Sequence, residues 1–432
     1  LGNCSGGVTP WGTILSGEEN VQHYFSGSLA RATERSPQER RNWDSMEVKD
    51  ASILDQQDDD LNGVGWYRHD SRFDIEREPR EFNRFGWLVE LDPYDPDFVP
   101  RKRTALGRFM HEGAAIVARP GERVVVYTGD DRKFECIYRF VSRNTYQPDD
   151  REASLAILDE GDLYVARFDE DGSGRWLKLN GLGETALARA GFESDAEMLI
   201  EPRVMAARVG GTPMDRPEDI DVSPVTDRVC VALTKNRSRR PDDTDATNPR
   251  ANNRWGQILE IVPPGRDGKH DHAADGFRWG LLLLAGDPEH PQAEQRGRYG
   301  DGAAGSDWFC NPDNLAFDPT GNLWVATDGF PKAGPHTSAG GPVHDGLWAV
   351  PASGARRAEP RHFFGCPRGA ELCGPCFTPD GETLFVAVQH PGGEAGSDFS
   401  SPSTRWPDFD PDLPPRPAVV AVTKKGGGRI GD

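Results

Sequence analysis

The stretch PDNLAFDPTGNLWVATDG, residues 312–329, contains two short apolar runs joined by the turn DPTGN. A turn rich in Pro, Asp and Gly between two such runs is typical of a β-hairpin. The same order of apolar run, turn and second strand occurs in PEDIDVSPVTDRVCVALT (217–234) and in GPCFTPDGETLFVAVQHP (374–391). Repetition of one hairpin type along a chain indicates a repeat architecture.

Two looser copies extend this pattern. HEGAAIVARPGERVVVYTGDD (111–131) is predicted to be a fourth hairpin, and TPWGTILSGEEN (9–20) the second half of a fifth whose first strand is missing. The 49 Gly and 35 Pro among 432 residues favour turns over long helices. We predict an all-β chain, a single β-propeller domain over residues 1–432 with inserted loops and a few short helices. A β-sandwich is the alternative.

Composition excludes several classes of function. The net charge of −20 argues against nucleic acid or an anionic membrane as the main partner. No apolar run reaches the ~18 residues of a membrane-spanning helix. The seven cysteines are odd in number and irregularly spaced, so they do not form a disulfide framework. Cys373 and Cys376 form a CxxC without a second pair, which argues against a zinc site.

Polar side chains gather where the predicted hairpins open. In an antiparallel hairpin the start of the first strand lies beside the end of the second. If the first strands run parallel, these carboxylates meet, and cations such as Ca²⁺ would neutralise them. The alternative is that the acids only end strands in turns. Strand starts carry Glu112, Glu218, Asp219, Asp313 and Asn314, and strand ends carry Glu18, Glu19, Asn20, Asp130, Asp131, Asn236, Asp328, Gln389 and His390.

Two residues do not suit a plain calcium site. Cys4 lies in NCSGG, whose glycines allow the backbone to approach a ligand, and a thiolate among oxygen ligands favours a metal such as iron. Arg216 directly precedes Glu218, and a guanidinium beside a cation cluster points to a bound anion such as phosphate. The alternatives are that Cys4 is a small buried apolar residue and that Arg216 pairs with Asp215 or Glu218.

Six segments together carry a resemblance to a known family. They are NCSGGVTPWGTILSGEEN, GRFMHEGA, VVVYTGDD, RPEDI, NPDNLAFDPTGNLWVATDG and GAELCGPCFTPDGETLFVAVQHPGG. In this order they resemble the PhoX-type alkaline phosphatases from residue 1 to about 395. The resemblance implies a six-bladed propeller that hydrolyses phosphate monoesters with ferric iron and calcium. It also implies twin-arginine export to the periplasm or beyond, and a chain that lacks its N-terminal signal and first strands.

The resemblance implies a role for individual residues. Glu112 and Arg216 match residues that handle the phosphoryl group, and Asn20 lies near the phosphate. Cys4 matches the iron ligand, and residues 235–257 resemble a loop between blades in which Asn253 and Arg254 adjoin the site. The expected metal ligands are Cys4, Glu19, Glu112, Asp130, Glu218, Asp313 and Glu371. Relatives usually carry apolar or small residues at positions 373 and 376, so the two cysteines there depart from the pattern.

The chain offers no Ser-His-Asp or phosphoserine-type nucleophile context, so we predict a metal-bound oxygen nucleophile. A calcium-dependent lactonase-like propeller would share PDNLAFDPTGNLWVATDG but would not need Cys4 or Arg216. A non-catalytic calcium-binding propeller is the third alternative. We expect a monomer acting on phosphomonoesters, with no membrane insertion and no nucleic acid as a structural partner. Residues 396–432 are expected to hold a final strand and a partly flexible tail.

Overall fold

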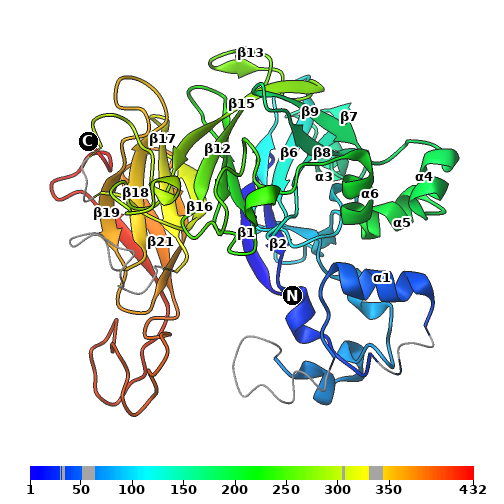
Figure 1. Cartoon of the computed structure of the whole chain (residues 1–432), viewed down its shortest axis with the longest axis horizontal. Helices are drawn as coiled ribbons and strands as arrows, with labels where there is room; N and C mark the ends of the chain where they lie inside the picture. The colour runs from blue at the N-terminus through cyan, green and yellow to red at the C-terminus, as the bar shows by residue number, and fades with distance from the viewer. Residues whose placement is uncertain (30, 32–34, 51–63, 304–306, 330–343) are drawn as a thin grey trace. The chain divides into compact units, whose positions relative to one another are not determined.

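The computed structural model describes residues 1–29, 31, 35–50, 64–303, 307–329 and 344–432. The chain divides into two compact units, which are Leu1–Arg167 with Trp176–Thr212 and Phe168–Arg175 with Pro213–Asp432. Both consist mainly of antiparallel strands joined by loops (Figure 1). Within the described ranges, no helix has both the length and the apolar character needed to cross a membrane.

The first unit contains two antiparallel sheets. One has the order β1-β2-β3-β4, and the other runs through β5-β6-β7-β8 to β9, whose first residues belong to the second unit. Apolar side chains such as Leu15, Val124 and Phe140 are fully or almost fully buried between them. The strands are β1 (Asn3–Val8), β2 (Ile14–Glu18), β3 (Leu88–Leu91), β4 (Arg101–Lys102), β5 (Ala115–Val117), β6 (Arg123–Gly129), β7 (Ile137–Thr145), β8 (Gly161–Phe168) and β9 (Ser173–Lys178).

The first hairpin corrects one expectation from the sequence. Its first strand is not missing, because β1 pairs with β2 in antiparallel register, with Gly7 opposite Leu15. The strand escapes sequence patterns because it carries glycines where strands usually carry branched residues. A Cβ on Gly6 would lie 1.8 Å from the carbonyl oxygen of Leu15, and one on Gly7 would lie 2.0 Å from that of Ala114. Close backbone approach therefore requires glycine at both positions.

Short helices accompany the strands of the first unit, as predicted. The first begins after Ser36, whose hydroxyl accepts from the backbone N–H of Glu39 while the Glu39 side chain accepts from the Ser36 N–H, forming a capping box. Leu187, Met198 and Met205 of the last three helices share one buried apolar cluster. The α-helices are α1 (Pro37–Ser45), α3 (Arg151–Ala156), α4 (Glu184–Ala190), α5 (Asp195–Ile200) and α6 (Pro202–Val209).

The second unit contains the three hairpins that carry the repeat, and each is confirmed. They pair as β10 with β11, β16 with β17 and β20 with β21. Further strands extend two of them into the sheets β16-β17-β18-β19 and β20-β21-β22, and the third into the order β10-β11-β12-β15, in which β15 pairs with residues 173–175 of β9. The strands are β10 (Pro217–Val222), β11 (Val229–Leu233), β12 (Gln257–Val262), β13 (Gly265–Arg266), β14 (Lys269–His270), β15 (Gly276–Leu284), β16 (Pro312–Phe317), β17 (Asn322–Thr327), β18 (Gly346–Pro351), β19 (Arg361–Gly365), β20 (Glu371–Phe377), β21 (Thr383–Gln389) and β22 (Ala418–Thr423).

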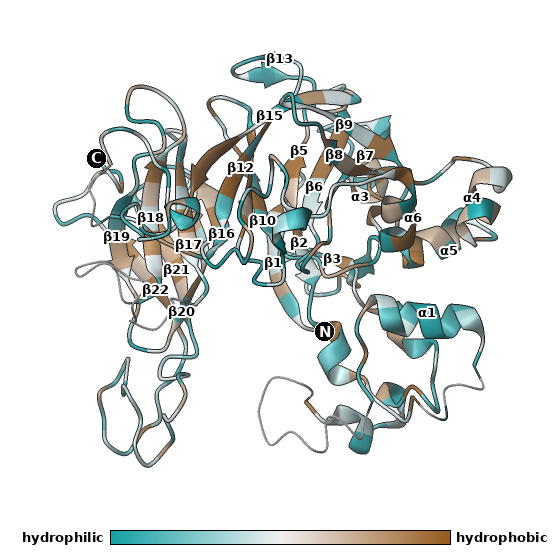
Figure 2. Cartoon of the chain, in the orientation of Figure 1, coloured by the Kyte–Doolittle hydropathy of each residue, from teal (hydrophilic) through white to brown (hydrophobic). Residues whose placement is uncertain are grey.

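Carboxylate and amide side chains join the first strands of these hairpins. Asp219 Oδ2 accepts from the backbone N–H of Leu315 at 3.1 Å, and Asp221 Oδ2 accepts from that of Phe317 at 2.7 Å. A step of two residues along β10, from Asp219 to Asp221, corresponds to a step of two residues in the same sense along β16, from Leu315 to Phe317. The two strands therefore run in the same direction. Asn314 Oδ1 accepts from the N–H of Gly374 on β20. Figure 2 shows that the apolar residues lie mainly on the strands and the polar residues mainly on the connecting loops.

Candidate active site

One thiol and two carboxylates meet in the first unit. Cys4 lies on β1, Glu19 directly follows β2, and Glu112 precedes β5. Their ligand atoms all lie within 4.8 Å of one another, and Cys4 Sγ donates to Glu112 Oε1 at 3.2 Å. Both carboxylates are buried, whereas Cys4 is exposed. Buried like charges need a cation, and a sulfur ligand among oxygens suits a transition metal such as iron, so this donor set fits the metal that the resemblance implies.

Glycines of the first hairpin bring Glu112 to this cluster. A Cβ on Gly17 would lie 2.2 Å from the carbonyl oxygen of His111, and one on Gly7 would meet Ala114. The segment 111–114 therefore lies directly against the backbones of β1 and β2. His111 is fully buried, with its ring nitrogens near the Thr128 hydroxyl and the Gly107 carbonyl oxygen. Burial lowers the pKa of His111 to about 3, so it holds the segment as a neutral imidazole.

Of the two adjacent glutamates, Glu19 is the one in the cluster. The Glu18 carboxylate accepts from Lys102 Nζ at 2.8 and 2.9 Å and pairs with the amine of Leu1 at 2.8 Å. Side chains of successive residues in an extended chain point to opposite sides. Asn20 Nδ2 donates to Glu19 Oε1 at 2.6 Å, so Asn20 adjoins the cluster as well.

The two adjacent aspartates after β6 separate in the same way. Both carboxylate oxygens of Asp130 are bound by Arg203, at 2.7 Å from Nε and 2.5 Å from Nη2, and Asp130 is fully buried. Asp131 instead has a carboxylate oxygen within 4.8 Å of a Glu112 oxygen. Asp130 as a metal ligand stays a prediction, and Asp131 is a further candidate. Both are acids at a strand end, so the sequence pattern alone does not distinguish them.

In the second unit, Arg216 and Glu218 form an ion pair. Arg216 Nη2 lies 2.8 Å from Glu218 Oε1, and the side chains are 20% and 3% exposed. Arg216 adopts the left-handed backbone conformation, with φ of 58°, directly before Pro217. Its carbonyl oxygen accepts from the N–H of Thr234 at 3.2 Å. The arginine is therefore held in place and remains partly open to solvent, as an anion-binding side chain must be.

The other expected ligands of the second unit lie at strand starts. Asp313 is buried on β16. Glu371 opens β20 and contacts two side chains, His390 Nε2 at 3.2 Å and Cys373 Sγ at 3.1 Å. The hydrogen bond that His390 donates to the Glu371 carboxylate raises the pKa of His390 to about 9, which keeps this imidazole charged at neutral pH. Cys373 thus touches an expected ligand, whereas Cys376 is exposed.

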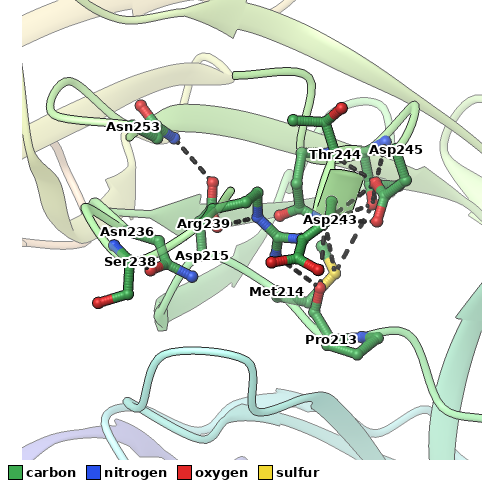
Figure 3. Close-up of polar contacts among 12 residues, drawn as sticks. Pro213, Met214, Asp215, Asn236, Ser238, Arg239, Asp243, Thr244, Asp245 and Asn253 are labelled. Carbon is green, nitrogen blue, oxygen red and sulfur yellow. Dashed lines mark hydrogen bonds and ion pairs between the residues drawn. The ribbon is translucent and has the colours of Figure 1, made fainter. Parts of the chain in front are cut away.

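The loop between β11 and β12 contributes a buried polar network (Figure 3). Asn253, expected near the site, donates from Nδ2 to Asp215 Oδ2 at 2.9 Å, while Arg254 is exposed. Asp215 also pairs with Arg239, whose Nε lies 2.6 Å from Asp215 Oδ1. No sequence pattern pointed to Arg239, since a buried ion pair between a loop and a strand start leaves no periodic signal.

The chain is similar to known proteins over most of its length. The family described as Alkaline phosphatase PhoX matches residues 1–392. A solved structure, Pseudomonas fluorescens PhoX in complex with vanadate, a transition state analogue, is similar to this chain with a TM-score of 0.86 and 39% sequence identity. The similarity covers 99% of this chain and 70% of that one. No curated protein matches the chain.

Proposed function

The chain belongs to the PhoX alkaline phosphatase family, and we propose on this premise that it hydrolyses phosphate monoesters with a cluster of iron and calcium ions. Membership makes the chain a phosphoric monoester hydrolase. The lactonase-like and non-catalytic alternatives are disfavoured, because the family match extends over both Cys4 and Arg216. The single observation that carries the metal proposal is the convergence of Cys4, Glu19 and Glu112 within 4.8 Å.

The expected ligands are of two chemical kinds, suited to different metals. Cys4, with Glu19 and Glu112, would hold iron, because a thiolate selects a softer metal than oxygen ligands do. Carboxylates alone suit Ca²⁺. The proposed calcium ligands of the second unit are Glu218, Asp313 and Glu371. In the first unit Asp130 stays a proposed metal ligand, and Asp131 is a further candidate. The structure supports the iron ligands through their mutual distances. It supports Glu218 and Asp313 through their burial, and all three ligands of the second unit through their position at strand starts.

The side chains of the chain bind and orient the substrate. When bound, the metals supply Lewis acidity and the oxygen nucleophile. Arg216 offers a planar set of N–H donors that fits two phosphoryl oxygens, and its contribution grows as charge develops on them. Asn20 can donate to a further phosphoryl oxygen from its amide. Glu112, which belongs to the same cluster as Glu19, is proposed to orient the phosphoryl group. Vanadate, which binds the Pseudomonas fluorescens protein as a transition state analogue, should inhibit this enzyme too.

Location and assembly belong to the same proposal. We expect export to the periplasm or the medium, because the enzyme would then meet phosphomonoesters outside the cytoplasm. A monomer is proposed, and gel filtration of the purified protein measures it directly. Separation of periplasmic and cytoplasmic fractions of the native host, followed by immunodetection, tests the location.

The decisive experiment compares Cys4→Ser with Cys376→Ser. Both cysteines are exposed and form no disulfide, so the second variant controls for thiol loss. After gel filtration into metal-free buffer, we expect Cys4→Ser to lose iron on the order of tenfold or more, together with activity on p-nitrophenyl phosphate. Cys376→Ser should keep both. Unchanged iron in Cys4→Ser would refute Cys4 as a ligand, and full activity of iron-free protein would refute the iron requirement.

A further inference from the structure

The backbone at Arg216 is in a conformation that needs support. A left-handed conformation at a residue other than Gly is disfavoured, because its Cβ lies too close to the following carbonyl oxygen, and a following proline restricts the residue further. Arg216 has φ of 58° and precedes Pro217. Such a conformation persists only where the surrounding structure fixes it. The neighbouring contacts of the second unit should therefore explain how it is held.

Asp215 is fixed from two directions (Figure 3). Arg239 Nε donates to Asp215 Oδ1 at 2.6 Å, and Asn253 Nδ2 donates to Asp215 Oδ2 at 2.9 Å. Asp215 and Asn253 are fully buried and Arg239 is 4% exposed. A carboxylate removed from water in this way is stable only when both oxygens are paired. The Asp215 side chain therefore has one position.

The two donors are themselves held by the backbone. Arg239 Nη2 donates to the Pro213 carbonyl oxygen at 2.9 Å and Nη1 to that of Asp243 at 2.5 Å. Asn253 Oδ1 accepts from the N–H groups of Trp255 and Gly256 at 3.2 and 3.1 Å. Arg239 is thus connected to the chain just before Asp215, and Asn253 is connected to the residues just before β12.

This arrangement fixes both sides of Arg216. Asp215 is held before it, and Pro217 opens β10 after it, opposite Leu233. Between these points the left-handed backbone turns the guanidinium to Glu218, 2.8 Å away. A long arginine side chain otherwise loses much conformational entropy on binding an anion.

We propose that Asp215, held by Arg239 and Asn253, is a positioning residue that presets the Arg216 guanidinium for the phosphoryl group. This inference rests on the proposed phosphate-binding role of Arg216. Asp215 then affects kcat/KM only by positioning Arg216. Replacing Asp215 should therefore have no further effect on kcat/KM in a protein that already lacks the Arg216 guanidinium. That dependence distinguishes positioning from a general role in folding.

The test is a double-mutant cycle on the full chain with its metals bound. For Asp215→Asn we expect kcat/KM on p-nitrophenyl phosphate to fall by about tenfold and the inhibition constant of inorganic phosphate to rise similarly. In the Arg216→Ala background, Asp215→Asn should change kcat/KM by less than about twofold. Arg239→Lys should act in the same direction as Asp215→Asn.

Glu90→Gln is the matched control, because Glu90 pairs with Arg103 in a comparably buried ion pair. The side chains of Glu90 and Arg103 are 0% and 1% exposed, and those of Asp215 and Arg239 are 0% and 2% exposed. It should lower the melting temperature similarly while kcat/KM stays within about twofold. If Asp215→Asn does not fold, Asn253→Ala keeps the ion pair and provides the same cycle.

The outcomes separate the two proposals. Suppose that Arg216→Ala lowers kcat/KM strongly and that Asp215→Asn lowers it just as much in the Arg216→Ala background as in the wild type. This result would overturn the positioning role of Asp215 and leave the phosphate-binding role of Arg216 intact. Equal activity of Asp215→Asn and Glu90→Gln would overturn it as well. A negligible effect of Arg216→Ala by itself would overturn the phosphate-binding role of Arg216 and, with it, this inference.

Discussion

At the scale of single residues, small side chains decide where the reactive ones lie. Cys4 and Glu112 are more than a hundred positions apart, yet Cys4 Sγ reaches Glu112 Oε1 at 3.2 Å. Gly7 and Gly17 allow this, because a Cβ on either would lie within about 2.2 Å of a facing carbonyl oxygen. Gly7 and Gly17 are therefore needed to bring Glu112 close to Cys4.

Gly17→Ala tests this view. The added methyl group would lie 2.2 Å from the His111 carbonyl oxygen and would push the segment with Glu112 away. We expect iron content and kcat/KM to fall by on the order of tenfold. Gly280→Ala is the control, since a Cβ there meets nothing within 4 Å. Equal activity of the two variants would contradict the packing argument.

Arg216→Ala tests the anion-binding residue directly. Loss of its guanidinium should lower kcat/KM on phosphomonoesters by ~10²-fold or more, because its contacts strengthen as charge develops on the phosphoryl oxygens. Arg228→Ala is the control, since Arg228 is also a half-buried, ion-paired arginine of the second unit. A loss below about threefold in Arg216→Ala would eliminate its proposed role.

At the scale of elements, hairpin register determines which polar residues face one another. Pro312 lies opposite Thr327, Pro217 opposite Leu233 and Glu371 opposite Gln389, so each hairpin opens where the sequence places its polar residues. One acid and one amide among the predicted strand-start residues also have structural roles. Asp219 and Asn314 hydrogen-bond to the next first strand, so part of the acidic pattern joins sheets.

One carboxyl group between β17 and β18 makes stability depend on pH. Asp345 is buried, accepts from the Thr327 hydroxyl at 2.7 Å and from the Gly329 N–H at 3.0 Å, and burial raises its pKa to about 7. The folded state therefore binds a proton more tightly than the unfolded state, whose pKa is 3.8. Stability from this group is present at low pH and is lost as pH rises from about 4 to 7.

Asp345→Asn removes this titration. Relative to the variant, wild-type protein should lose melting temperature steadily between pH 5 and pH 7 and no further above pH 8. Thermal unfolding followed by circular dichroism at each pH measures the difference. A wild-type-minus-variant difference that is constant with pH, or that grows as pH rises, would contradict the assignment.

At the scale of the whole molecule, the acidic composition predicts that bound cations raise the stability of the folded state. Glu19, Glu112 and Asp131 are buried carboxylates within one unit, and the proposed cations would relieve their mutual repulsion. Removal of metals with a chelator should lower the melting temperature by about 5 °C or more and abolish phosphatase activity. Returning calcium and iron together should restore both. A chelated protein with unchanged melting temperature and activity would refute the metal proposal.

The propeller-like fold class and the phosphatase family, both predicted from the sequence, are confirmed by the similarity to the Pseudomonas fluorescens structure. The single domain and the six blades stay predictions. In the described residues the chain divides into two compact units by its contacts.

The sequence alone determined the hairpins, because alternating apolar residues and turn signals act within about twenty positions of one another. It also pointed to Cys4, Glu112 and Arg216 through a resemblance spread along the chain. Tertiary structure decided what depends on distant neighbours. Only there does β1 become a strand, since its glycines are explained by the backbones that lie against them. Only there do Glu18 and Glu19 take different roles, because Lys102 neutralises the first and Cys4 and Glu112 lie near the second.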